Sequence, residues 1–258
     1  MEIKLGSLKR DAEEAEGTAI IIDVFRAFTT AAIAFDHGAK EITLFAEPTD
    51  ALALHKKGVG DYLMGEVDGK KPEGFDFGNS PHEISQVDLT GKTLIQSTRA
   101  GTVGVEAASK ALQIFLGSFV VAQATVDAIK AENPELVSII AMGDQGVVRS
   151  DEDEHCGIYL RNIMEERKPD FNAVKSLILK GGATQKFFDP QQPQYHPGGR
   201  YPRFGGRPLP ICHEDQPRGW ADSSPKARWL DLGCEPVQCQ VLSPGTLGLP
   251  SAIKSNTA

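Results

Sequence analysis

The chain has 258 residues, 40% of them hydrophobic and 24% charged, a composition typical of soluble globular proteins that excludes fibrous and disordered classes. Its formal net charge of -8 disfavours nucleic-acid binding, because no basic surplus is present to displace counterions from a phosphate backbone. No apolar run reaches the roughly 18 residues of a membrane span and no signal-peptide pattern follows Met1, so we expect a cytoplasmic protein without membrane contact. The four cysteines form no CxxC pair, which favours reduced thiols over a zinc site.

Apolar runs alternate with helix-like segments from the start of the chain. A β-branched run over residues 18–24 predicts a strand, and the alanine-rich stretch 27–37 predicts the helix after it. Residues 41–46 are expected to form the next strand. Residues 49–57 are expected to form the next helix, with Thr49 as its N-cap.

The same alternation continues through the middle of the chain. Further strands are expected at 93–96, 113–116 and 137–142, and further helices at 104–110, from just after Gly117-Ser118 to about Ala131, and at 151–167. Strands that alternate with helices favour a mostly parallel or mixed sheet with helices on both faces. We therefore expect one α/β domain over residues 1–195.

Polar clusters follow several of the predicted strands. They lie at residues 23–30, 97–102, 117–118 and 143–154. In a parallel sheet, ligands gather outside the carboxyl ends of the strands, so these clusters predict one shared site. The stretch 65–80 lacks periodicity and is expected to be a long functional or mobile loop.

The segment Asp23-Val24-Phe25-Arg26-Ala27-Phe28-Thr29-Thr30 has the residues needed to bind a phosphoryl group at a helix start. Backbone N–H groups and the helix dipole attract an anion, Arg26 supplies a charged fork, and Thr29 and Thr30 can donate hydrogen bonds. Asp23 could hold a cation or act as a nucleophile. The alternative is an ordinary capped helix with a surface ion pair.

The segment Ser97-Thr98-Arg99-Ala100-Gly101-Thr102 repeats this pattern at a second strand end. Its glycine permits close approach of the backbone to an anion, although a generic turn explains the same residues. No glycine set along the chain forms a Walker loop or a dinucleotide fingerprint, so nucleotide binding has little support.

Acidic and polar residues elsewhere could complete such a site. The acidic run 151–154 lies at the start of the predicted helix 151–167, where it complements the positive helix end or supplies oxygen ligands to magnesium. A solvated charged face is the alternative for this run. In the 65–80 loop, Glu66, Asp76, Asn79 and Ser80 offer polar atoms to a ligand held between strand ends.

The motifs DVFRAFTTA, GE, KPEGFDFGNSP, STRAGT, GSFV, MG and DEDEHCG occur in this order over about residues 20 to 160. In this combination they resemble the 2-phosphosulfolactate phosphatase family. The resemblance implies a three-layer α/β/α fold and a magnesium-dependent hydrolase that converts (R)-2-phospho-3-sulfolactate to 3-sulfolactate and phosphate, a step towards coenzyme M. The alternatives are a phosphatase for another 2-hydroxy acid phosphate, such as phospholactate, and an inactive anion-binding protein.

The resemblance also suggests roles for individual residues. We expect Asp23, Arg26 and Glu66 to be catalytic, with Asp23 as nucleophile or metal ligand. The expected substrate-binding residues are Thr29, Thr30, Asn79, Ser80, Thr98, Arg99, Gly101, Thr102 and Ser118, with Arg99 as a clamp for the carboxylate or sulfonate. The expected Mg²⁺ ligands are Asp23, Asp76, Asp151 and Glu152. The expected partner is a small organic phosphate, and a homodimer is one option for the oligomeric state.

The chain changes character after His196. Nine of its 16 prolines, three of its four cysteines and both tryptophans fall from Pro197 onward, with no helix or strand pattern of useful length. We expect residues 196–258 to form an irregular tail, which is unusual in a compact domain. A frameshift near His196 would explain it, because codons compatible with residues 207–219 can be read one base later as a strand-like string. A natural disordered extension is the alternative.

Overall fold

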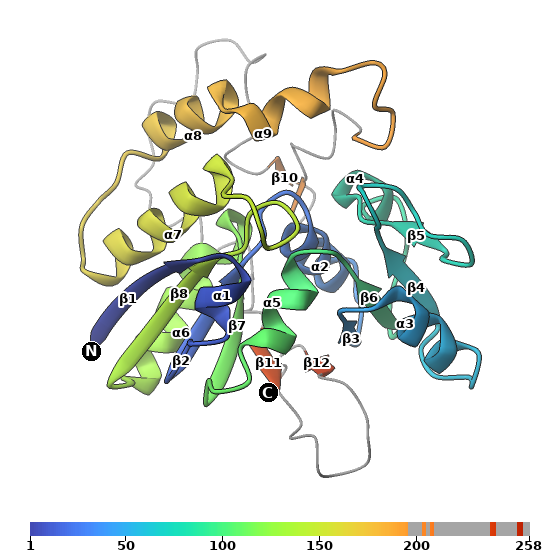
Figure 1. Cartoon of the computed structure of the whole chain (residues 1–258), viewed down its shortest axis with the longest axis horizontal. Helices are drawn as coiled ribbons and strands as arrows, with labels where there is room; N and C mark the ends of the chain where they lie inside the picture. The colour runs from blue at the N-terminus through green and yellow to red at the C-terminus, as the bar shows by residue number, and fades with distance from the viewer. Residues whose placement is uncertain (196–202, 205–206, 209–237, 241–251, 255–258) are drawn as a thin grey trace.

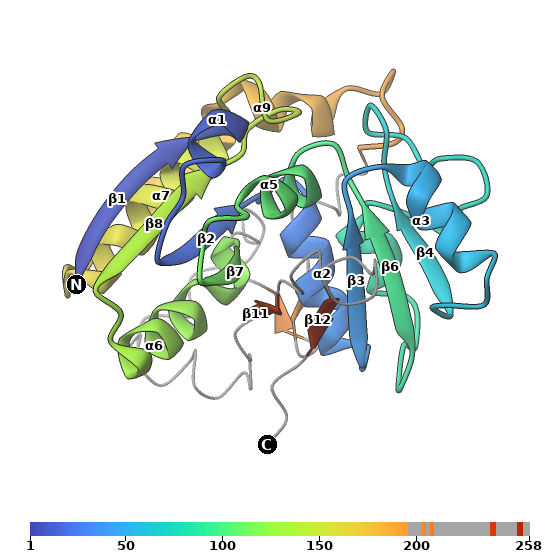
Figure 2. The same cartoon turned by 60° about the horizontal axis from the view of Figure 1, so that its bottom comes forward.

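The computed structural model describes residues 1–195 and four short strands beyond them, at residues 203–204, 207–208, 238–240 and 252–254. The central layer is a sheet of ten strands in the order β1-β8-β2-β7-β11-β12-β3-β6-β4-β5. Helices lie on both sides of this sheet (Figure 1, Figure 2). The fold is therefore the three-layer α/β/α arrangement that the sequence predicts.

The first eight strands pair only in parallel with one another. They are β1 (Glu2–Ser7), β2 (Thr18–Ile22), β3 (Glu41–Phe45), β4 (Tyr62–Gly65), β5 (Phe77–Gly78), β6 (Thr93–Ser97), β7 (Gln113–Gly117) and β8 (Leu136–Ala141). Strand β2 lies between β7 and β8 and is buried along its whole length, which explains the apolar run of its residues 19–22.

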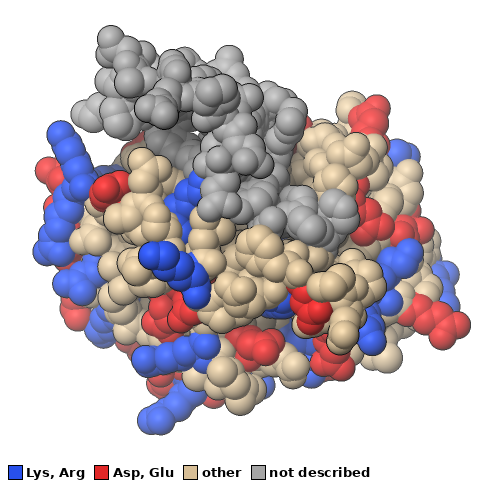
Figure 3. Space-filling view, turned by 90° about the horizontal axis from the view of Figure 1, so that it is seen from above, with Lys and Arg blue, Asp and Glu red and all other residues tan. Residues whose placement is uncertain are grey.

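The helices of the described chain are α1 (Leu8–Ala12), α2 (Ala27–Asp36), α3 (Pro48–His55), α4 (Pro81–Ile84), α5 (Gly101–Ala107), α6 (Ala122–Glu132), α7 (Asp151–Met164), α8 (Phe171–Lys180) and α9 (Gly182–Gln185), with 3-10 turns η1 at Phe119–Val121 and η2 at Lys186–Phe188. No helix in the described part of the chain is long and apolar enough to cross a membrane. On the face shown in Figure 3, acidic and basic side chains are interspersed.

Two helix starts differ from the predictions by three residues or fewer, and the predicted N-cap Thr49 is wrong. Helix α3 begins at Pro48 with Glu47 in the N-cap position, not at Thr49, because proline suits the first turn of a helix, where its missing N–H is not needed. Helix α5 begins at Gly101 instead of residue 104, because the Asp23 carboxylate accepts a hydrogen bond from the Gly101 N–H. The other predicted strand and helix ends agree with the structure to within three residues.

Alternate residues of β2 face opposite sides of the sheet. Ile20 and Ile22 pack into a layer with α6, α7 and α8, whereas Ile21 packs with α1, α2 and α5 on the other face. A third cluster joins Ala51 of α3 to Leu63 and Ile95 of the neighbouring strands. The sheet is thus covered on both faces, and its strand ends are held at fixed positions.

Four strands of two or three residues lie within the predicted irregular tail. They are β9 (Arg203–Phe204), β10 (Arg207–Pro208), β11 (Gln238–Gln240) and β12 (Ala252–Lys254). Strands β11 and β12 pair antiparallel to each other and to β7 and β3, which makes the sheet mixed. Strands this short carry too few residues to show a periodic pattern.

The rest of the predicted irregular tail lies outside the described residues, and the frameshift stays a prediction. Cys156 is a buried free thiol, as expected. The side chains of the other three cysteines fall outside the description.

Gly65 is required where β4 ends beside β6. Its φ is +158°, and a Cβ there would overlap the carbonyl oxygen of Ser97. We expect Gly65→Ala to lower the free energy of unfolding by about 1–3 kcal/mol, because the clash is with backbone that cannot move aside easily. Urea unfolding followed by circular dichroism measures this. Gly182→Ala is the matched control, because a Cβ at Gly182 meets nothing within 4 Å; equal stability of the two variants would contradict the expectation.

Candidate active site

A cavity of about 510 Å³ lies beyond the carboxyl ends of β2, β4, β6 and β8. Three of the predicted polar segments line it, through residues that follow β2, β6 and β8, and so does the loop after β4. The expected site residues on its wall are Asp23, Arg26, Glu66, Asn79, Arg99, Asp151 and Glu152. Residues from the chain after α8, including Lys186 and Tyr195, complete the wall.

Asp23 follows β2 and is buried at the base of two helices. Its Oδ1 accepts a hydrogen bond from the Ala27 N–H of α2 at 3.0 Å, and its Oδ2 accepts one from the Gly101 N–H of α5 at 2.8 Å. Burial raises the pKa of Asp23 to about 6, although these two hydrogen bonds act to lower it. The charge of Glu66 adds to the rise. A Cβ at Gly101 would lie 2.9 Å from Oδ2, so glycine permits this close approach.

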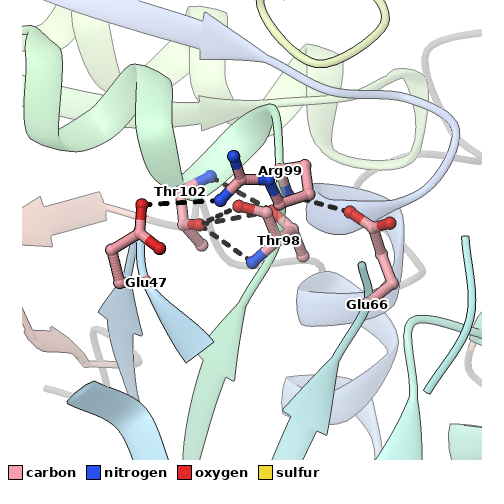
Figure 4. Close-up of polar contacts among 5 residues, drawn as sticks. All are labelled: Glu47, Glu66, Thr98, Arg99 and Thr102. Atoms are coloured by element: carbon pink, nitrogen blue, oxygen red, sulfur yellow. Dashed lines mark hydrogen bonds and ion pairs between the residues drawn. The ribbon is translucent and has the colours of Figure 1, made fainter. Parts of the chain in front are cut away.

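Glu66 follows β4 and joins its own loop to the loop after β6. Its Oε2 accepts from the Gly69 N–H at 2.7 Å, and its Oε1 accepts from the Arg99 N–H at 2.8 Å (Figure 4). The Arg99 guanidinium points away from Glu66, and its Nη1 lies 3.4 Å from Oε1 of Glu47. Arg99 therefore has its backbone fixed and its charged group near the surface.

Asp153 has a similar role that the sequence did not single out within the acidic run. It is 2% exposed, and its Oδ1 and Oδ2 accept from the Val24 N–H at 2.7 Å and the Gly143 N–H at 2.8 Å. Burial raises the pKa of Asp153 well above its ordinary value, and the charges of Glu152 and Asp23 raise it further. Asp153 differs from the other acidic residues of the run because it lies on the buried side of α7. Which side is buried depends on how the helix packs.

Asp23, Glu66 and Asp153 thus form three carboxylate bridges, each joining two backbone N–H groups. The Asp153 bridge connects the loops after β8 and β2, the Asp23 bridge connects the loop after β2 to α5, and the Glu66 bridge connects the loops after β4 and β6. Hydrogen bonds from N–H groups to a carboxylate are among the stronger ones in proteins. The bridges therefore fix the loops that line the cavity.

Arg26 is a buried cation on the cavity wall, 3% exposed. Its Nη1 donates to the carbonyl oxygen of Gln194 at 2.8 Å, and its Nη2 donates to that of Gly69 at 3.2 Å. The guanidinium carbon lies 4.7 Å from the centroid of the Tyr195 ring. These partners are neutral, so they orient Arg26 without neutralising its positive charge. A positive charge that is oriented in this way can bind an anion.

Glu152 differs from the three bridging carboxylates. It is 3% exposed and lines the cavity, and its Oε2 is buried without a hydrogen-bond partner among the described residues. Burial raises the pKa of Glu152 to about 7, while the positive charge of Lys186 acts in the opposite direction. A buried oxygen without a partner indicates a missing cation, proton or water.

Several expected ligand-binding hydroxyls bond within the protein instead. Thr29 and Thr30 donate to the backbone carbonyls of Val24 and Arg26 at 2.8 and 2.9 Å, and neither lines the cavity. Thr102 donates to the Thr98 carbonyl at 2.7 Å and accepts from the Thr98 N–H at 2.9 Å (Figure 4). These threonines shape the starts of α2 and α5.

The remaining expected residues divide in the same way. Asn79 lines the cavity, and its Oδ1 is buried without a partner among the described residues. Ser80 caps α4 by accepting from the Glu83 N–H, and Asp76 accepts from the Leu63 N–H at 2.8 Å. Neither these two nor Ser118, which is buried, is on the cavity wall.

The acidic residues of the cavity fit a magnesium site that has only one or two carboxylate ligands. In the described part of the chain, no three Asp, Glu, His or Cys side chains converge as ligands. Mg²⁺ is commonly held by one or two carboxylates, with water and phosphate oxygens as its other ligands. The unpartnered oxygen of Glu152 and the nearby Asp23 fit such a site. Asp151 fits less well, because it is exposed to solvent whereas Asp23 is buried in the cavity wall. Asp76 lies off the cavity wall.

Comparison with known proteins places the amino-acid sequence of this chain in a family. Three relatives carry the name "Probable 2-phosphosulfolactate phosphatase". The one from Bacillus subtilis is 36% identical over 180 residues, covering 68% of this chain and 77% of the relative. The one from Caldicellulosiruptor saccharolyticus is 35% identical over 59% of this chain and 64% of its own length, and the one from Clostridium acetobutylicum is 34% identical over 65% and 68%. The family model described as 2-phosphosulpholactate phosphatase matches residues 6–186, and this chain belongs to that family.

Proposed function

We propose that this chain is a magnesium-dependent phosphoric monoester hydrolase that converts (R)-2-phospho-3-sulfolactate to 3-sulfolactate and phosphate, a reaction on the route to coenzyme M. Its family and the names of its relatives support the substrate. The observation that carries the chemistry is the buried, unpartnered oxygen of Glu152 in the same cavity as Asp23 and Arg26.

The cavity supplies the charge compensation that phosphoryl transfer requires. Negative charge is spread over the oxygens of the transferring group, so a catalyst needs preorganised positive charge and N–H donors there. Arg26 provides a buried positive charge at the start of α2, and the N-terminus of α7 reaches the same cavity. The positive ends of these helix dipoles favour an anion at this place.

Asp23 and Glu152 would hold Mg²⁺, with phosphoryl oxygens and water completing its ligands. When bound, the ion would neutralise charge on the phosphoryl group and polarise it towards attack. We favour Asp23 as a metal ligand over a nucleophile, because an N–H bond to each of its oxygens lowers the nucleophilicity of the carboxylate. The cytoplasmic location and the homodimer stay predictions from the sequence.

The proposed reaction is tested by a phosphate-release screen with the full chain. We expect release from (R)-2-phospho-3-sulfolactate that requires Mg²⁺, stops with EDTA and returns when Mg²⁺ is added in excess. Phospholactate in the same screen tests whether the substrate is another 2-hydroxy acid phosphate. Turnover that is indifferent to EDTA would contradict the metal requirement, and turnover of phospholactate alone would contradict the substrate.

Glu152→Gln tests the metal site without changing the shape of the side chain. We expect phosphate release to fall by at least about 100-fold, because removing a charged ligand weakens Mg²⁺ and leaves the phosphoryl charge uncompensated. Titration calorimetry should show weaker Mg²⁺ binding, while the melting temperature stays the same or rises because a buried charge is removed.

The matched control is Glu165→Gln, at the far end of α7, where the side chain is paired with Arg161 on the surface. It should retain wild-type turnover. Wild-type magnesium affinity and turnover in Glu152→Gln would contradict the assignment.

A further inference from the structure

An aromatic cluster fixes the chain after α9 against the cavity. The Phe187 ring is buried, and its centroid lies 5.1 Å from that of Phe25 and 5.5 Å from that of Tyr195, edge-on in both cases. The Tyr195 hydroxyl reaches the backbone of Gly69 in the loop after β4 so closely that a Cβ there would overlap it. The segment from Lys186 to Tyr195 is thus held to two of the loops that form the site.

This cluster places a second cation beside Arg26. The Lys186 Nζ lies 4.8 Å from the centroid of the Tyr195 ring and 5.8 Å from that of Phe187. The guanidinium of Arg26 lies 4.7 Å from the same Tyr195 centroid. Cations at these distances are attracted by the ring quadrupole, which steadies a lysine side chain that is otherwise flexible.

The Lys186 ammonium lies on the same cavity wall as the described acidic residues but forms no ion pair with them. Burial raises the pKa values of Asp23 and Glu152, and the charge of Lys186 opposes part of both rises. Within the described residues, however, it forms no ion pair within 4.0 Å and no hydrogen bond. Three N–H donors are therefore available at the cavity wall for an anionic ligand.

We propose that Lys186 is a phosphoryl-binding residue, whose ammonium donates to oxygens of the phosphoryl group that Arg26 faces. The inference rests on the proposed function and adds a residue to its site. The phosphoryl group is favoured over the second acid group of the substrate, because Lys186 and Arg26 lie 4.8 and 4.7 Å from the centroid of the same Tyr195 ring on the cavity wall. An ammonium there offsets charge that Arg26 alone leaves uncompensated.

The test compares Lys186→Met and Lys186→Arg in the full chain. In Lys186→Met we expect kcat/KM for (R)-2-phospho-3-sulfolactate to fall about 10- to 100-fold, as for loss of a hydrogen bond to a charged group. Binding of inorganic phosphate, measured by titration calorimetry, should weaken by a similar factor. Lys186→Arg keeps the charge and should restore part of both losses.

Lys180→Met is the matched control, because it removes one positive charge from the exposed end of α8, off the cavity wall. It should behave as wild type. Melting temperatures confirm folding, and Lys186→Gln replaces Lys186→Met if the latter fails to fold.

Two results would overturn the inference. One is a wild-type affinity for inorganic phosphate in the variant without charge at position 186. The other is a loss of activity towards (R)-2-phospho-3-sulfolactate while activity towards phenyl phosphate is unchanged. That result would assign Lys186 to the second acid group. Because inorganic phosphate binding needs no turnover, this arm gives an answer even if the wild type hydrolyses none of the 2-phospho acids, which is the outcome that refutes the proposed function.

Discussion

The candidate site depends on carboxylates that hydrogen-bond to backbone N–H groups across the ends of the sheet. Burying a carboxylate is costly unless strong hydrogen bonds compensate for the lost water, and Asp23, Glu66 and Asp153 each have two such bonds. The raised pKa values of Asp23 and Asp153 reflect the desolvation that remains. The Asp153 and Glu66 bridges join loops that follow neighbouring strands, and the Asp23 bridge joins the loop after β2 to α5, on the other side of the sheet centre.

The distribution of hydrogen bonds separates residues that build the site from residues that can meet a ligand. Thr29, Thr30, Thr98 and Thr102 use their hydroxyls on nearby backbone groups, where they define the helix starts. The buried Oε2 of Glu152 has no such partner among the described residues. A ligand is therefore expected where polar groups remain unsatisfied, not wherever polar side chains are numerous.

The chain after α8 contributes the last wall of the cavity. Phe187 packs against Phe25, which follows β2, and against Tyr195, whose ring lies near both Lys186 and Arg26. The cavity is thus acidic at the strand ends and basic beside the aromatic cluster. Such a division suits a cation and a phosphate group bound next to each other.

The sequence by itself determined the alternation of strands and helices, the family, and the presence of Asp23, Arg26, Glu66 and Arg99 at strand ends, because hydrophobic period and short motifs are local signals. Only the tertiary structure decided that α5 begins at Gly101 and that Asp153 is a bridge. Their partners are 78 and up to 129 residues away in the chain. The role of Lys186 likewise depends on aromatic contacts between distant segments, which no local pattern encodes.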